Sequence, residues 1–314
     1  MKKLFYTFAT AALISSTAAM AEQSVAITAI VQHPALDAAR DGVIDYLKEN
    51  GKADVKVTYD SAQGDTTIAA QIAQKYATGD YDVIVAIATP SALAVKTAIE
   101  DKPIVFTAVT DPVAAGLISS MDQGEANITG ISDLAPVEQQ IKMMQELFGN
   151  DITIGVPYNP SEANAVSLVE LTKEIGQKLN VKIETAAAFT TGEVPQATSK
   201  LLSSSNVLYL INDNTIASAA DAIIEMANDA EIPTFTASPD MVAQGALISL
   251  GTDYYNIGKQ TGAQVAQILN GASPKDIKPV VAAASELILN MKTADILGYK
   301  FPADILAKAT KAIK

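Results

Sequence analysis

The chain contains no cysteine, no tryptophan, one histidine and one arginine among its 314 residues. Without cysteine, neither a disulfide nor a lipid anchor on a cysteine behind a leader peptide can form. His33 alone cannot make a zinc site, which needs several histidine or cysteine ligands, so we expect no metal. A Ser-His-Asp triad could use only His33, and no Gly-x-Ser-x-Gly turn is present to expose a serine. We therefore expect no catalytic residues and no enzyme activity.

Cofactor motifs are also missing. No Gly-x-Gly-x-x-Gly segment follows a predicted strand, so a dinucleotide site is unsupported. The segment Gly258-Lys259-Gln260-Thr261 lacks the glycine spacing of a phosphate loop and lies inside a helical pattern. We expect no cofactor.

Basic residues are scarce relative to acidic ones, 22 against 35, and the formal net charge is −13. An excess of negative charge opposes contact with a phosphate backbone, so we expect no nucleic-acid partner. The single arginine, Arg40, has a further consequence. Unless Arg40 itself supplies the contact, an anionic ligand must be held without a bidentate guanidinium.

Residues 1–21 have the pattern of a cleavable secretory signal peptide. Lys2 and Lys3 precede a mostly apolar segment, 4–14, and Ala19-Met20-Ala21 supplies small residues at the cleavage positions. The apolar segment is shorter than the roughly 20 residues that a membrane span needs. We expect export to the periplasm as a free, soluble protein that is monomeric.

The remaining sequence alternates apolar runs of strand length with amphipathic stretches, which is typical of an α/β protein with parallel sheets. Predicted strands span 24–31, 55–59, 83–87, 104–107, 128–131, 152–156, 181–187, 207–211, 234–236, 246–250 and 287–289. Predicted helices span 36–49, 66–77 (capped by Asp65), 137–148, a stretch capped by Ser161 and ending near 179, 194–202, the stretch from the corner 212–214 to 228, and 254–269.

Two segments about one domain length apart resemble each other. The segments 83–116 and 207–245 both combine a strand, a polar corner, a helical stretch and a second strand. Both contain Phe-Thr-Ala, at 106–108 and at 235–237, followed by an Asp and, five residues later, a Gly. Such a repeat predicts two similar Rossmann-like lobes, each with a parallel sheet.

The division between the lobes follows from the breaks in the pattern. Residues 132–136 form a polar break with a proline at a helix start, which we interpret as the first passage between lobes. The tail after Gly251 has too few elements for a third domain, so we expect it to complete the other two. The predicted lobes are 22–134 with about 252–279 for the first, and 135–251 with about 280–314 for the second.

In open parallel sheets, ligands bind beyond the carboxyl ends of the strands, where helix N-termini converge. The polar residues at these corners are therefore candidates for a binding site. In the first lobe they are His33, Gln63, Thr89, Ser91, Thr107 and Asp111; in the second lobe they are Tyr158, Asn159, Glu162, Asn164, Asp213, Asn214 and Asp240, and Tyr254 begins the last long helix.

The residue types suggest how these positions could share a zwitterionic ligand. Thr89, Ser91 and Thr107 could hold a carboxylate with help from helix N–H groups, and Asp213 or Asn214 could hold an ammonium group. Tyr158 and His33 would line the pocket for the ligand's side chain.

Each of these residues also has a structural interpretation. Thr89, Ser161 and Thr215 could simply cap helices, and Asp111 and Asp240 could be turn residues. Tyr158 and Tyr254 could pack at the rim between the lobes, and His33 could be a corner residue without a ligand role.

The corners match a known pattern. In order they read QHPALDAAR (32–40), AQGD (62–65), AIATP (86–90), VFTAVTDP (105–112), TGISD (129–133), YN (158–159), EAN (162–164), DNT (213–215) and DYY (253–255). This series resembles the ABC transporter substrate-binding proteins of the tryptophan/tyrosine-binding (TrpX-like) type, over essentially the whole chain after residue 21. The resemblance implies a type I periplasmic binding protein with three interdomain crossovers that closes on a small molecule.

Two positions depart from that pattern, Lys259 where many members have arginine and Ser91 where alanine is common. From the resemblance we expect a periplasmic receptor that closes on an aromatic or other hydrophobic amino acid and delivers it to an inner-membrane ABC permease. Two alternatives share the fold: a sensory ligand-binding protein for a membrane receptor, and a periplasmic enzyme.

Overall fold

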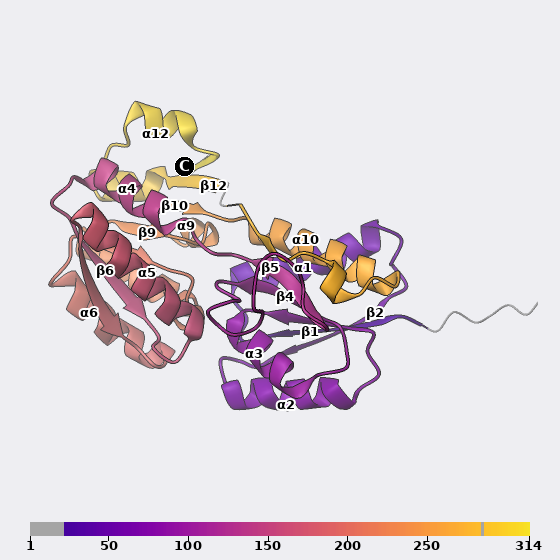
Figure 1. The fold of residues 1–314 in the computed structure, drawn as a ribbon. Coiled ribbons are helices and arrows are strands. Elements are labelled where there is room, and N and C mark those ends of the chain that lie inside the picture. Colours follow the sequence, from indigo (N-terminus) through magenta and orange to yellow (C-terminus); the bar gives the residue numbers. More distant parts are fainter. Residues whose placement is uncertain (1–21, 284–285) are drawn as a thin grey trace, which may run out of the picture.

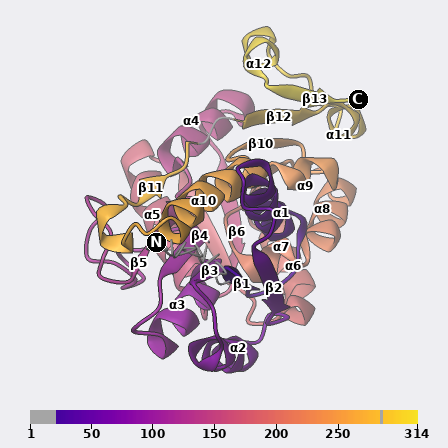
Figure 2. The same ribbon diagram turned by 90° about the vertical axis from the view of Figure 1, so that its right-hand side faces the viewer.

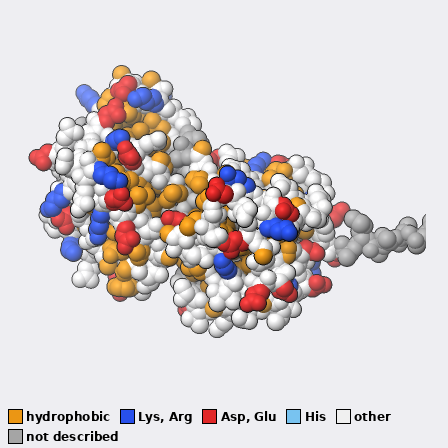
Figure 3. All heavy atoms as spheres, viewed as in Figure 1, with side chains coloured by type: hydrophobic (Ala, Val, Ile, Leu, Met, Phe, Trp, Pro, Cys, Tyr) orange, Lys and Arg blue, Asp and Glu red, His pale blue; other side chains and the backbone are white. Residues whose placement is uncertain are grey.

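The fold was analysed in a computed structural model that describes residues 22–283 and 286–314. The predicted signal peptide, 1–21, lies outside these residues. The chain forms two α/β lobes that lie side by side and meet at a narrower waist (Figures 1 and 3). Over the described ranges, no helix has the length and apolar character needed to cross a membrane.

Lobe 1 is built on a six-stranded parallel sheet covered by helices on both faces (Figure 1). In sheet order its strands are β11 (Val280–Val281), β5 (Ile128–Ser132), β4 (Ile104–Val109), β3 (Val83–Ile87), β1 (Ser24–Ala29) and β2 (Lys56–Ser61). Helices α1 (Pro34–Glu49) and α10 (Tyr254–Leu269) cover one face, and α2 (Thr66–Thr78) and α3 (Thr89–Ala98) cover the other. Because both faces are covered, every residue of β3 and β4 is buried and apolar side chains dominate these strands.

Lobe 2 is built on a seven-stranded sheet. In sheet order its strands are β13 (Lys311–Ile313), β12 (Glu286–Asn290), β10 (Ile248–Gly251), β9 (Thr234–Thr236), β8 (Val207–Leu210), β6 (Thr153–Tyr158) and β7 (Lys182–Ala187). Its helices are α4 (Val137–Phe148), α5 (Ala163–Leu179), α6 (Val194–Leu202), α7 (Asn214–Ala217), α8 (Ala220–Asp229), α9 (Asp240–Ala243), α11 (Met291–Ile296) and α12 (Ala303–Lys308). Among the strand pairs formed by residues 22–283 and 286–314, β10–β12 alone is antiparallel.

The internal repeat is visible in the order of the strands. Lobe 1 contains the order β5-β4-β3-β1-β2, and lobe 2 contains the corresponding order β10-β9-β8-β6-β7. Phe106 of β4 and Phe235 of β9, which the repeat aligns, are both fully buried at equivalent places in the two cores. The predicted fold class, two Rossmann-like lobes with parallel sheets, is confirmed.

The chain passes between the lobes three times: after β5, after β10, and between β11 and β12. One boundary differs from the prediction. Val280–Val281, assigned to lobe 2 from the sequence, pairs with β5 in lobe 1. The strand is only two residues long, which is too short for hydrophobic periodicity to reveal.

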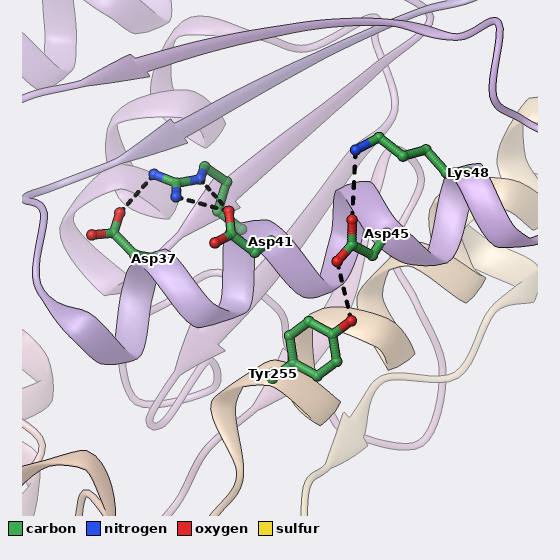
Figure 4. A network of polar contacts seen from close by, with 6 residues as sticks. Asp37, Asp41, Asp45, Lys48 and Tyr255 are labelled. Atoms are coloured by element: carbon green, nitrogen blue, oxygen red, sulfur yellow. Dashed lines mark hydrogen bonds and ion pairs between the residues drawn. The ribbon is translucent and has the colours of Figure 1, made fainter. Parts of the chain in front are cut away.

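Helix α10 returns from the tail to lobe 1 and lies along α1 (Figure 2). The two backbones approach closely because glycines face the contact: a Cβ on Gly42 would lie 2.2 Å from the Tyr255 carbonyl oxygen, and one on Gly258 would lie 2.1 Å from that of Ala39. At the edge of the contact, the Tyr255 hydroxyl donates to Asp45, 3.1 Å away (Figure 4). The second passage between lobes is therefore fixed firmly to lobe 1.

Most predicted elements are present, several with the predicted bounds, and Asp65 caps α2 by accepting from the backbone N–H groups of Thr67 and Ile68. Other local predictions are wrong. The N-cap of α5 is Glu162 and not Ser161. The helix predicted to run to 228 is divided into α7 and α8.

Candidate ligand-binding site

A cavity lies between the lobes at the carboxyl ends of the strands. Its volume of about 30 Å³ is well below the roughly 300–1,000 Å³ typical of small-molecule sites, so its walls must move apart to admit a ligand. Both lobes contribute to its lining: His33, Leu36, Thr89, Ala108, Thr110, Asp133, Asn164, Ile211, Asn212, Asp213, Asn214, Ala217, Ser238, Met241 and Tyr254. Six of the fourteen residues predicted from the sequence are in this set: His33, Thr89, Asn164, Asp213, Asn214 and Tyr254.

The N-terminus of α3 brings two hydroxyl groups to this region of lobe 1. Thr89 and Ser91 are buried, and neither hydroxyl has a hydrogen-bond partner in the described part of the chain. The helix has no side-chain N-cap, since Ala88 holds that position with φ at 73°. The interpretation of Thr89 as a cap is therefore wrong. Free N–H groups at a helix N-terminus, together with hydroxyls, favour an anionic group.

The corner after β4 contributes different residues from those predicted. Thr107 is buried on the side of α10, where its hydroxyl accepts from the Thr261 hydroxyl at 2.8 Å. Ala108 and Thr110 line the cavity instead. Neighbouring side chains of a strand point to opposite faces, so the prediction chose the wrong face of β4. Asp111 lies outside the cavity and accepts from the Ala114 backbone N–H at 2.9 Å, as a turn residue does.

Asp133 lines the cavity and is not among the predicted residues. It lies on the first passage between lobes and is 3% exposed. Its carboxylate accepts from the Tyr254 hydroxyl at 2.7 Å, the Asn212 amide at 3.1 Å and the Thr110 hydroxyl at 3.2 Å. Burial raises the pKa of Asp133, and these hydrogen bonds only partly oppose the rise. The sequence signal was its place in the polar break after β5.

Glu162 and Asp213 form a densely bonded cluster in lobe 2. Glu162 accepts five hydrogen bonds, from backbone or side-chain groups of Asn164, Asn214 and Thr215. Asp213 accepts from the backbone N–H of Asn159 at 2.6 Å and that of Ile216 at 2.9 Å. Burial, and then the nearby charge of Glu162, raise the pKa of Asp213. Both carboxylates are thus engaged in holding the corners after β6 and β8, and Asp213, not Thr215, caps α7.

The other predicted residues are distributed around the cavity. Gln63, Asn159 and Glu162 line an adjacent interlobe cavity of about 350 Å³, and Asp240 lines one of about 260 Å³ that shares Tyr254 with the first. Tyr158 does not line any of these three cavities; its ring packs against the core of lobe 2. Ser91 is buried near the start of α3 without lining the first cavity.

His33 enters the cavity from the start of α1. Both ring nitrogens are buried and have no hydrogen-bond partner within residues 22–283 and 286–314. Asn214 lies close enough to influence the ring but outside hydrogen-bonding geometry. Burial lowers the pKa of His33 in spite of the opposing charge of Asp240, which favours the neutral imidazole.

The charge of the cavity is unbalanced. Two carboxylates, Asp133 and Asp213, line it, whereas no lysine or arginine is found among its lining residues. Arg40 pairs with Asp37 at 2.6 Å and Asp41 at 2.8 Å along α1 (Figure 4). A buried carboxylate without a cation favours a ligand that brings a positive charge.

Two lobes of the same topology around an interlobe cavity lined by both define a two-lobed binding protein. The chain matches the family model for ABC transporter substrate binding protein over residues 24–313. It therefore belongs to the ABC transporter substrate-binding protein family. It is 34% identical to a "Tyrosine-binding protein" of Clostridioides difficile over 90% of this chain and 83% of that protein.

Two solved structures are similar along almost their whole length. An ABC domain from Streptococcus pneumonia in complex with L-Trp has a TM-score of 0.90 at 31% identity, covering 93% of this chain and 100% of that chain. A ligand-free, open substrate-binding protein with adhesive properties from Clostridium difficile has a TM-score of 0.70 at 34% identity, with coverages of 93% and 100%. At similar identity, the lobe arrangement of this chain is nearer to that of the ligand-bound relative.

Proposed function

We propose that this chain binds a zwitterionic aromatic amino acid between its lobes and presents it to an inner-membrane ABC permease. The observation that carries the proposal is the cavity itself, which combines buried carboxylates without a cation and a helix N-terminus with unpartnered hydroxyls. An α-amino acid supplies an ammonium group for the buried carboxylates and a carboxylate group for the helix N-terminus. The names of the tyrosine-binding and tryptophan-bound relatives support an aromatic side chain.

The ammonium group is best placed at Asp133. We expected Asp213 or Asn214 from the sequence, but the oxygens of Asp213 are engaged by backbone N–H groups and Asn214 bonds Glu162. Asp133 accepts only from neutral hydroxyl and amide groups. A ligand ammonium would give this buried carboxylate the charged partner that the protein does not provide.

The carboxylate group of the ligand is best placed at the start of α3. Thr89 offers a hydroxyl that faces the cavity without a partner, and the first turn of the helix adds free N–H groups. The positive end of the helix dipole favours an anion there, typically by about 0.3–1 kcal/mol. This arrangement needs no arginine.

Closure of the lobes follows from where these groups lie. Asp133 is on the first passage between lobes, Tyr254 begins the helix after the second, and Asn212 follows β8 of lobe 2. A ligand held by Asp133 and Thr89 therefore contacts the hinge and lobe 1 at once, and it reaches lobe 2 only when the lobes are closed. Such a ligand shifts the open–closed equilibrium toward the closed state.

The export signal predicted at residues 1–21 supports a periplasmic location, where such a receptor would meet its permease. The ligand is tested by isothermal titration calorimetry and thermal unfolding of residues 22–314 with the twenty amino acids. We expect tyrosine, tryptophan or both to bind, and a ligand at 100 times its dissociation constant to add about 2.7 kcal/mol to the free energy of unfolding. Tyramine and 3-(4-hydroxyphenyl)propionate, each lacking one charged group, are the controls and should bind weakly. A protein that responds to no aromatic amino acid would contradict the proposal.

A further inference from the structure

The cavity contains the His33 imidazole, which holds neither the ammonium group nor the carboxylate group of the ligand in the proposed arrangement. His33 has two buried ring nitrogens without a hydrogen-bond partner in the described chain. We infer that His33 is a specificity residue that hydrogen-bonds a polar group on the ligand's aromatic side chain, so that the site selects tyrosine or tryptophan over phenylalanine. This inference rests on the proposed function.

The position of His33 separates it from the groups that would hold the two charges of the ligand. The groups that influence its ring are Asp37, Glu162, Asn214 and Asp240. Asp133 is instead surrounded by Thr110, Asn212 and Tyr254. None of the hydrogen-bond donors to Asp133 is among the groups that influence His33, so the imidazole takes no part in the bonding of Asp133.

The surroundings of His33 suit the side chain of the ligand. Leu36, in the first turn of α1, also lines the cavity. Ala217 and Met241 add apolar surface from lobe 2, and a methionine thioether packs favourably against aromatic rings. An aromatic ring in this part of the cavity would carry its polar substituent toward the imidazole.

The chemistry of a neutral imidazole fits that substituent. One ring nitrogen donates and the other accepts. A phenol hydroxyl can donate or accept, and an indole N–H can donate to the accepting nitrogen. Phenylalanine would leave the buried imidazole unpaired, and an unpaired buried polar group costs about 1–3 kcal/mol, which is roughly a tenfold to 100-fold loss of affinity.

The test compares the dissociation constants of tyrosine, tryptophan, phenylalanine and O-methyltyrosine by titration calorimetry at pH 7.5. The parent protein should bind tyrosine at least about tenfold more tightly than phenylalanine. His33→Leu, which keeps apolar volume, should weaken tyrosine binding by roughly tenfold to 100-fold and change phenylalanine binding by less than about threefold. His33→Gln, whose amide can both donate and accept, should restore part of the preference for tyrosine.

A matched control is Ser249→Ala, because Ser249 is also buried with an unpartnered hydroxyl but does not line the cavity. It should leave all four affinities unchanged. A parent that binds phenylalanine as tightly as tyrosine, or a His33→Leu protein that loses all ligands equally, would overturn the inference while leaving the proposed function intact. A parent that binds no aromatic amino acid would overturn both. If His33→Leu does not fold, the four ligands measured on the parent and on His33→Gln decide the question.

Discussion

The two lobes share one strand order, yet their cavity-facing edges are bonded differently. In lobe 2, Glu162 accepts five hydrogen bonds and Asp213 accepts two, so the carboxylates hold the corners in place. In lobe 1, Thr89, Ser91 and both nitrogens of His33 are buried without a partner among the described residues. Lobe 2 also has atoms at the cavity without a partner in the same part of the chain, the side-chain amide oxygens of Asn164 and Asn212. The two edges therefore differ in the carboxylates that are hydrogen-bonded in lobe 2, and both contain unpartnered groups.

The two kinds of group should have different roles. The hydrogen-bonded carboxylates Glu162 and Asp213 stabilise the corners of lobe 2 and have little capacity left to bind a ligand. Groups that are buried and unpartnered reduce stability until a ligand bonds them, because each costs about 1–3 kcal/mol. Asp133 stands between the two cases, since it is hydrogen-bonded but lacks a charged partner.

The largest effect on stability should follow from removing the Glu162 carboxylate of lobe 2, which accepts five hydrogen bonds. Glu162→Ala leaves several buried donors without an acceptor, and we expect the free energy of unfolding to fall by about 3 kcal/mol or more. Urea unfolding followed by circular dichroism measures the loss. Asp111→Ala, a turn residue outside the cavity, is the control and should cost less than about 1 kcal/mol. Equal losses of unfolding free energy in the two variants would contradict a stabilising role for the hydrogen bonds that Glu162 accepts.

Asp133→Asn should separate binding from stability. Removing the charge should weaken binding of the aromatic amino acid by more than about 100-fold, because an ammonium in a buried pair loses about 3–5 kcal/mol when its partner is removed. The same variant should be at least as stable as the parent without ligand at pH 7, because burying the charged carboxylate is unfavourable. Titration calorimetry and thermal unfolding test the two halves. If the Asp133→Asn protein binds the amino acid as tightly as the parent, Asp133 does not hold the ammonium group.

Thr89→Val should affect binding alone. The variant keeps the shape of the side chain and deletes a hydroxyl that has no partner, so the unfolding free energy without ligand should stay the same or rise slightly. Ligand affinity should fall roughly tenfold. A matched change in lobe 1, Thr107→Val, deletes a hydroxyl that is bonded to Thr261 and should lower stability without altering affinity. The reverse pattern would show that the other face of β4 holds the ligand.

The pH dependence should give a smaller, graded effect. Burial raises the pKa of Asp133 above its unfolded value, so its contribution to stability is present below the unfolded pKa and is lost as the pH rises through the folded pKa. A ligand ammonium lowers that pKa again. Affinity should therefore rise with pH, by at most about tenfold per unit, up to the pKa of the free protein.

Calorimetry between pH 4 and 8 measures this dependence. The pKa of Asp213 is raised as well, so the Asp133→Asn variant is needed to separate the two groups. A slope unchanged in that variant would assign the dependence to Asp213.

Much of the fold could be predicted because the strands are apolar on both faces. The apolar run of β3 and the amphipathic patterns of α4, α6 and α10 predicted those elements with the bounds that the structure has. The site was less predictable. Choosing Thr107 over Thr110 needed the direction in which β4 enters the corner, and finding Asp133 needed the packing of Tyr254 and Asn212 around it.

The sequence by itself determined the two lobes, their repeat and the strand ends at which a ligand would bind, because hydrophobic periodicity and polar corners are local properties. Only the tertiary structure decided which corner residues are still free to bind. Asp213 and Thr89 look alike in the sequence, as polar residues at helix starts. The backbone N–H groups of Asn159 and Ile216 engage one, while the other is buried with no partner. That difference depends on groups brought together from distant parts of the chain.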